Sequence, residues 1–241
     1  MNSDYLRRNE IEGAVMKVCD SLESHRTQIR DWKDYSEDEL WFELVSCILG
    51  SRVRYESAKA CTAHLRNVGL LEIESLIKSP RSMRNRIRRE LNKSIYPPFS
   101  NGRGLKYRYP KSRSTYIVRT GLQIYKNENL TIKGVLRECR NGNEARDVIV
   151  KKCSGIGLKQ ASLFLRNISF CDDLAILDSH VIRYVELLEL NKEFNNLISE
   201  DGNQYLINEN MLRMYAISKR RSLATLDVGI WTVMRVIQRG T

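Results

Sequence analysis

The feature that most constrains the fold of this chain is a pair of glycines, Gly155 and Gly157, on either side of the apolar Ile156. Glycine adopts backbone angles that side chains resist, so this spacing predicts a tight turn whose backbone passes close to another surface. Apolar residues recur at helical spacing from Ala161 to Ile168, which predicts a short helix after the turn. Exposed N–H groups that lead from such a turn into a helix N-terminus favour phosphate binding.

A second helix is predicted soon afterwards. The apolar run 174–177 ends at Asp178, a residue type suited to cap a helix running from His180 to Leu190. Lys159 follows the glycine turn by two residues, and Asp178 lies nineteen residues later. An amine and a carboxylate can act as a nucleophile and its partner. The alternative is that Lys159 contacts a phosphate and Asp178 only caps its helix.

Composition favours a mostly helical chain. At 241 residues, the chain has room for a buried core in two lobes or two modest domains. It has 13 Gly and 4 Pro, helix formers dominate, and alternating strand patterns are hard to find. No apolar run approaches the ~20 residues of a membrane span, and the N-terminus lacks a signal-peptide pattern. We therefore expect an all-α cytoplasmic protein with no membrane association, near the nucleoid if the source is prokaryotic.

Positive charge is concentrated in one segment. Residues 78–119 hold thirteen Lys and Arg against one acid, Glu90, whereas the whole chain carries a net charge of +11. Such a block attracts a polyanion. Tyrosines and a phenylalanine interleave with cations over residues 95–113, which suits nucleic acid, although a solvated surface loop is the alternative. The phosphate contacts predicted in this segment are Arg103, Lys106, Arg108 and Arg113.

Local capping signals mark several helix ends. Ser36 and Glu39 form a capping-box pattern before an apolar run. Gly69 suits the end of a helix, and Thr131 and Asn143 suit two N-caps. The six cysteines contain no CxxC pair and read as small core residues, and the three histidines are too dispersed for a zinc site.

The runs GIGLKQASLFLRNI and LAILDSHVIR resemble the helix-hairpin-helix and catalytic-aspartate segment of the DNA glycosylase/AP lyase superfamily. The closest branch in this resemblance is the archaeal-type 8-oxoguanine DNA glycosylase family. The resemblance implies an all-α, two-lobed fold with a DNA groove between the lobes and a helix-hairpin-helix over 145–168. It also implies a monomeric base excision repair enzyme that removes an oxidised purine, with 8-oxoguanine as the leading candidate, from damaged double-stranded DNA and then cleaves the strand.

The resemblance assigns roles to single residues. Lys159 would form a Schiff base that leads to β-elimination, and Asp178 would stabilise the developing sugar cation. The turn 155–157 would supply hairpin backbone whose carbonyls can hold a monovalent cation, and no other metal is expected. His180 matches the family's motif histidine and would line the base pocket or pack in the core. Because the four-cysteine motif of some relatives is absent, we expect no iron–sulfur cluster and no other cofactor.

Two further stretches carry a weaker resemblance. ELVSCILGSRVRYESAKA resembles a helix–loop–helix that approaches the damaged base, which makes Arg52 and Arg54 candidate DNA contacts. LDVGIW resembles a C-terminal pattern that places Trp231 in the base pocket; the alternative is a core tryptophan. Relatives tend to end in a lysine used in base recognition, whereas this chain ends at residues 238–241 without one. The identity of the base therefore stays open.

We expect residues 1–35 and 190–241 to pack together and residues 36–189 to form the helical body. Two alternative functions remain. One is a non-catalytic helix-hairpin-helix DNA-binding protein, in which Lys159 and Asp178 are inessential. The other is a glycosylase of the same fold for a different damaged or modified base.

Overall fold

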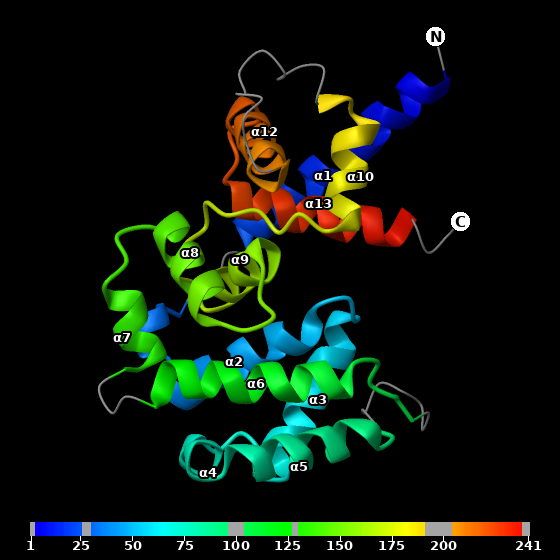
Figure 1. Ribbon diagram of the computed structural model, residues 1–241. Coiled ribbons are helices and arrows are strands. Elements are labelled where there is room, and N and C mark those ends of the chain that lie inside the picture. The colour runs from blue at the N-terminus through cyan, green and yellow to red at the C-terminus, as the bar shows by residue number, and fades with distance from the viewer. Residues whose placement is uncertain (1–2, 26–29, 96–103, 127–129, 191–203, 238–241) are drawn as a thin grey trace. The chain divides into compact units, whose positions relative to one another are not determined.

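The computed structural model describes residues 3–25, 30–95, 104–126, 130–190 and 204–237, and its regular elements are helices (Figure 1). In these ranges, the one strand-like pairing is an antiparallel bridge between Ile95 and Leu105. The chain divides into two compact units. The central unit comprises residues 31–168, and the terminal unit comprises residues 1–30 and 169–241. No helix in the described ranges is both long enough and apolar enough to span a bilayer.

The helices of each unit follow in chain order. The central unit contains η1 (Trp32–Asp34), α2 (Glu37–Gly50), α3 (Tyr55–Asn67), α4 (Ile73–Lys78), α5 (Pro80–Asn92), α6 (Pro110–Tyr125), α7 (Ile132–Arg137), α8 (Gly142–Lys152) and α9 (Leu158–Asn167). The terminal unit contains α1 (Ser3–Ser24), α10 (Ser179–Leu187), α12 (Gln204–Ser218) and α13 (Leu223–Ile237).

Helix α2 is the core helix of the central unit. The predicted capping box is confirmed: Ser36 Oγ accepts from Glu39 N, and Glu39 Oε2 accepts from Ser36 N. From Leu40 to Leu49, every residue except Phe42 is buried, because α3, α6, α7 and α9 all pack against this helix. The hairpin helix α9 is thereby attached to an apolar core.

The other capping predictions have mixed outcomes. Gly69 has φ +67° and ends α3 as predicted, because few residues other than glycine adopt that angle readily. Thr131 caps α7 by accepting from Gly134 N. The prediction for Asn143 is wrong, because Asn141 caps α8 by accepting from Glu144 N. Asn143 lies inside the helix, where its side chain accepts from Arg146.

The terminal unit is built around α13. Helix α1 approaches α13 closely at Gly229, where a Cβ would lie 2.7 Å from Cys19 Sγ. Helices α10 and α12 also pack against α13. The sequence analysis grouped residues 169–189 with the helical body, whereas the contacts group them with the two termini. The cause is the apolar face of α10, which joins the core of the terminal unit.

Candidate active site and DNA-binding surface

The glycine turn connects α8 to α9 as the sequence predicts. Gly155 has φ +77°, and a Cβ at this position would lie 2.2 Å from Cδ2 of Tyr116. Both the backbone angle and the neighbouring ring therefore require glycine. Ile156 is buried and anchors the turn, and Ser154 N donates to Thr120 Oγ1 at 2.9 Å. A monovalent cation on the carbonyls of this turn stays a prediction.

Gly157 leaves the N-terminus of α9 open. It is the N-cap residue, no side chain caps the helix, and a Cβ at Gly157 would have no atom within 4 Å. The first N–H groups of a helix have no intrahelical partner, so those of α9 are suited to bind an anion. Lys159 lies in this first turn and is half-buried. The opposite face of α9 is held in the core by Ala161, Phe164 and Leu165.

Asp178 caps α10, as predicted. Its Oδ1 accepts from His180 N at 2.8 Å and from Val181 N at 3.0 Å. For Oδ2, no hydrogen-bond partner is recorded in the described chain. One oxygen thus satisfies the helix end, and the other is available to a substrate. Lys159 belongs to the central unit and Asp178 to the terminal unit.

The two base-pocket predictions, His180 and Trp231, both lie in the terminal unit. His180 is half-buried, and its Nδ1 is buried without a hydrogen-bond partner in the described ranges. Trp231 lies on α13 with its side chain partly exposed, and the Arg235 guanidinium lies 4.6 Å from its ring centroid. The partial exposure of Trp231 does not match a fully buried core tryptophan.

A family model described as 8-oxoguanine DNA glycosylase matches residues 23–220. The chain belongs to this family. Its sequence is 30% identical over 220 residues to the 8-oxoguanine DNA glycosylase/AP lyase of Methanocaldococcus jannaschii, covering 89% of each chain. The enzyme of the same name from Fusobacterium nucleatum is 23% identical, with 94% of this chain and 96% of the relative covered.

Solved structures of the 8-oxoguanine DNA glycosylase family have the same fold. The M. jannaschii glycosylase matches with a TM-score of 0.60 and 26% identity, covering 99% of this chain and 92% of that one. The 8-oxoguanine DNA glycosylase of Thermotoga maritima matches with a TM-score of 0.62 and 24% identity, covering 95% of each chain. The predicted all-α helix-hairpin-helix fold of this family is thus confirmed.

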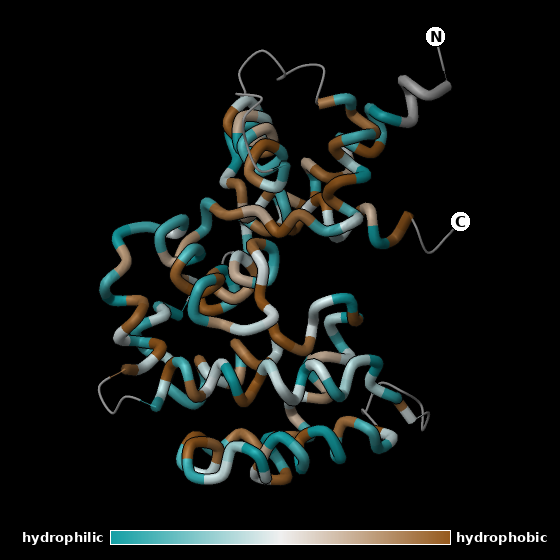
Figure 2. The backbone as a smooth tube through the Cα atoms, in the orientation of Figure 1, coloured by the Kyte–Doolittle hydropathy of each residue, from teal (hydrophilic) through white to brown (hydrophobic). Residues whose placement is uncertain are grey.

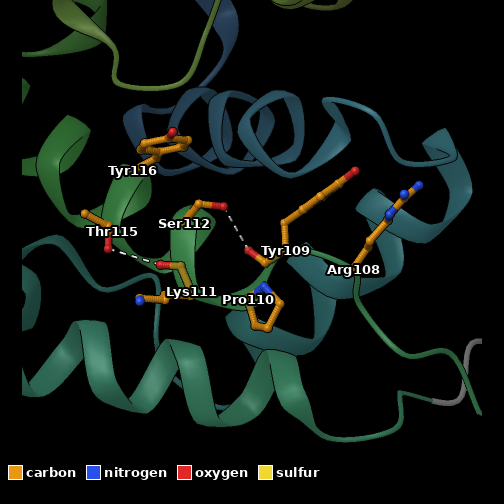
Figure 3. Close-up of a pocket in the computed structure, with 7 residues that line it drawn as sticks. All are labelled: Arg108, Tyr109, Pro110, Lys111, Ser112, Thr115 and Tyr116. Carbon is orange, nitrogen blue, oxygen red and sulfur yellow. Dashed lines mark hydrogen bonds between the residues drawn. The ribbon is translucent and has the colours of Figure 1, made fainter.

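The family's DNA-binding function directs attention to a pocket at the N-terminus of α6 (Figure 3). Seven residues line it: Arg108, Tyr109, Pro110, Lys111, Ser112, Thr115 and Tyr116. The pocket combines two tyrosine rings with two exposed cations, Arg108 and Lys111. Stacking surfaces beside cations suit a nucleic acid.

The predicted phosphate contact at Arg113 needs correction. Arg113 is only 8% exposed and donates from Nη2 to the Ser51 carbonyl at 3.1 Å. Its guanidinium lies 5.6 Å from the Tyr109 ring centroid and 5.3 Å from that of Tyr116. Arg113 therefore supports the pocket from beneath and stabilises the C-terminal end of α2, where carbonyls lack helical partners.

Tyr107 is likewise part of the core. It is 5% exposed, donates its hydroxyl to the Leu49 carbonyl at 2.7 Å, and has its pKa raised by burial. It is therefore unavailable for base stacking. The remaining predicted phosphate contacts fall into two groups: Arg52, Arg54, Lys106 and Arg108 are exposed, whereas Arg103 lies outside the described residues.

Helix α5 extends the basic surface. Met83, Ile87 and Leu91 form its buried side, and strongly hydrophilic residues dominate the rest (Figure 2). All five of its arginines are exposed: Arg81, Arg84, Arg86, Arg88 and Arg89. The single acid of α5, Glu90, pairs instead with His64 at 3.0 Å and Lys93 at 2.6 Å. The arginine charge of α5 thus faces solvent.

Sequence reasoning missed two buried carboxylates near Asp178. Glu209 on α12 accepts from Ala175 N at 2.9 Å, and Asp227 on α13 accepts from Ile176 N at 3.4 Å. Glu209 lies at the edge of a polar, asparagine-rich stretch in which nothing predicts burial. Asp227 belongs to the LDVGIW run, but its tryptophan drew the attention.

Proposed function

We propose that this protein is a bifunctional DNA glycosylase/AP lyase that excises 8-oxoguanine from duplex DNA and acts as a monomer. The observation that carries the proposal is the hairpin: an uncapped α9 N-terminus with Lys159 in its first turn, in a chain of the 8-oxoguanine DNA glycosylase family. The proposed chemistry needs only an amine and a carboxylate, so it requires no cofactor. We place the protein in the cytoplasm, with the nucleoid DNA if the source is prokaryotic.

DNA binding is the first step. The open N–H groups of α9 would hold one backbone phosphate, and the exposed cations of the central unit would contact others. The damaged base must leave the helical stack, at a cost of a few kcal/mol. Phosphate contacts and stacking against the aromatic pocket would offset that cost.

Lys159 would then act as the nucleophile. Its neutral Nζ attacks C1′ of the damaged nucleotide, and the bond from C1′ to the base nitrogen breaks, so the base leaves with the bonding electrons and takes up a proton. Ring opening of the aminal gives an iminium between Nζ and C1′. The iminium acidifies the 2′ proton, and its removal expels the 3′ phosphate by β-elimination. The strand breaks, and hydrolysis of the imine frees Lys159.

Asp178 would supply negative charge. Breaking the glycosidic bond places cationic charge on the sugar, and a preorganised carboxylate lowers the energy of that state. Its Oδ2 is suited to this role, because Oδ1 carries both capping hydrogen bonds. A carboxylate can also orient the attacking amine or accept a proton from it.

The decisive test is borohydride trapping of the covalent intermediate. Wild-type protein incubated with 8-oxoguanine duplex and sodium borohydride is expected to give a stable protein–DNA adduct, and Lys159→Gln is expected to give none. Lys151→Gln is the matched control, because Lys151 is an exposed lysine in the last turn of α8. An adduct with Lys159→Gln, or none with wild type on any lesion or abasic site, contradicts the mechanism. The second outcome favours a non-catalytic DNA-binding protein.

A second candidate concerns the lesion. The absence of a C-terminal lysine at residues 238–241 favours testing other damaged or modified bases. A panel of duplexes that differ only in the lesion decides this. We expect the 8-oxoguanine duplex to be cleaved fastest, and faster cleavage of another lesion would assign a different substrate to the same chemistry.

A further inference from the structure

The segment that leads into Asp178 has no helical hydrogen bonds of its own. Residues 173–177, here called the strap, run as an irregular extended chain between the hairpin helix and α10 (Figure 1). Leu174, Ala175 and Leu177 are buried in the terminal unit. Buried backbone N–H and C=O groups need partners. The strap must obtain them from side chains.

Helix α12 provides these partners from one face. Tyr205, Glu209 and Arg213 are spaced by four residues, so they lie in a single stripe along the helix. Tyr205 donates its hydroxyl to the Ala175 carbonyl at 2.7 Å, and Glu209 Oε1 accepts from Ala175 N at 2.9 Å. Arg213 Nη2 donates to the carbonyl of Asp173 at 2.8 Å. Both polar groups of Ala175 are therefore bound by α12.

Glu209 is the unusual member of this stripe. It is 2% exposed, and burying a carboxylate is unfavourable unless hydrogen bonds and a counter-charge compensate. Arg213 Nη2 lies 3.9 Å from Glu209 Oε2 and supplies that charge. On the next residue of the strap, Ile176 N donates to Asp227 of α13, because successive N–H groups of an extended chain point to opposite sides. The strap is thus held from two helices.

We propose that Glu209 is a positioning residue for Asp178. By fixing Ala175, the Tyr205–Glu209–Arg213 stripe fixes the start of the three-residue path to Asp178, whose length is limited to about 10 Å. The stripe thereby sets where the free Oδ2 of Asp178 lies. This inference rests on the proposed function, because it gives Asp178 its role in base excision.

Substitutions at Glu209 separate positioning from folding. Glu209→Gln keeps an oxygen acceptor for Ala175 N, whereas Glu209→Leu has similar bulk and no acceptor. We expect Glu209→Leu to lower the single-turnover rate of 8-oxoguanine excision by about 100-fold, the typical effect of misplacing a reacting group by about 1 Å. Glu209→Gln is expected to restore most of the rate. Affinity for lesion DNA should stay unchanged, because the predicted phosphate contacts lie in the central unit.

Trapping on a preformed abasic site provides a readout that misfolding would not spare. An abasic site presents an aldehyde, so Schiff-base formation with Lys159 develops no glycosidic cation for Asp178 to stabilise. We expect Glu209→Leu to give wild-type yields of borohydride adduct with abasic DNA. Loss of this adduct in step with loss of excision would overturn the positioning role.

A double-mutant cycle with Asp178→Asn tests the route of the effect. If Glu209 acts through Asp178, Glu209→Leu lowers excision no further in the Asp178→Asn background. Full additivity would overturn the proposal. Tyr215→Phe is the matched control, because Tyr215 is buried on the same helix and bonds to Glu12 and Tyr184 without contacting the strap. It is expected to excise at the wild-type rate.

If Glu209→Leu does not fold, Tyr205→Phe removes only the hydroxyl that binds the Ala175 carbonyl and is expected to slow excision in the same direction. A wild-type rate in this variant would then contradict the positioning role. Wild-type protein that cleaves no lesion duplex would instead show that the proposed function fails.

Discussion

At Asp178, one carboxylate oxygen accepts both hydrogen bonds that cap α10, and the other has no recorded partner in the described ranges. Asparagine caps helices about as well as aspartate but carries no charge. Asp178→Asn is therefore expected to change the free energy of unfolding by less than about 0.5 kcal/mol. Excision should slow by about 100-fold or more, because a stabilising charge is lost. Urea unfolding and single-turnover excision measure the two effects.

Asp178→Ala is the control for the capping role. It removes both the charge and the cap, and the lost cap is expected to cost about 1 kcal/mol of stability. If Asp178→Asn excised 8-oxoguanine at the wild-type rate, Asp178 would only cap its helix.

The two glycines of the hairpin turn predict opposite phenotypes. Gly155→Ala places a Cβ 2.2 Å from the Tyr116 ring at φ +77°, so we expect a loss of at least about 1–3 kcal/mol of stability. Gly157→Ala meets no atom within 4 Å and should fold normally. Its methyl group would lie where a phosphate approaches, so weaker DNA binding is expected. Urea unfolding and a DNA-binding titration separate the two, and equal stability of both variants would contradict the geometry.

At the scale of elements, a pH-dependent contact joins α1 to α12. Burial raises the pKa of Glu12, but hydrogen bonds from Lys219 and Tyr215 outweigh it, so the pKa lies below its usual value. A carboxyl with a depressed folded-state pKa contributes stability above its unfolded pKa and loses it as pH falls through the folded value.

We therefore expect Glu12→Gln to remove part of the acid sensitivity of the terminal unit. The wild-type protein should be more stable than Glu12→Gln near neutral pH by less than about 1 kcal/mol, since the pair is partly exposed. The difference should shrink below pH ~4.5. Urea unfolding of both proteins across this pH range measures it, and a difference independent of pH would refute the assigned contact.

At the scale of the whole molecule, electrostatics should dominate DNA affinity. We expect binding of duplex DNA to weaken steeply with salt, because each phosphate contact contributes a slope of about −0.9 in log affinity against log salt. Arg108→Gln should reduce the magnitude of this slope by about one, because Arg108 is exposed beside the aromatic pocket.

Arg113→Gln is the matched control for Arg108→Gln. Arg113 is buried against Ser51, so its loss should lower stability and leave the salt slope unchanged. Equal slopes for wild type and Arg108→Gln would remove Arg108 from the DNA surface.

The sequence by itself determined the features that depend on neighbouring residues. The Ser36 capping box, the Asp178 cap and the glycine turn at 155–157 were predicted because such interactions span only a few residues and have characteristic residue types. The helical class followed from composition and periodicity. The resemblance of the 153–183 segment to known glycosylases identified the family, which the family model then matched.

Only the tertiary structure decided which side chains are buried by distant partners. Tyr107 and Arg113 look like DNA contacts in a basic stretch, yet they bind carbonyls at the end of α2, about sixty residues away. The buried Glu209 binds the strap across thirty-four residues. Burial depends on which surfaces the folded chain brings together. A local pattern of charge therefore does not reveal whether a side chain meets solvent, DNA or the protein's own backbone.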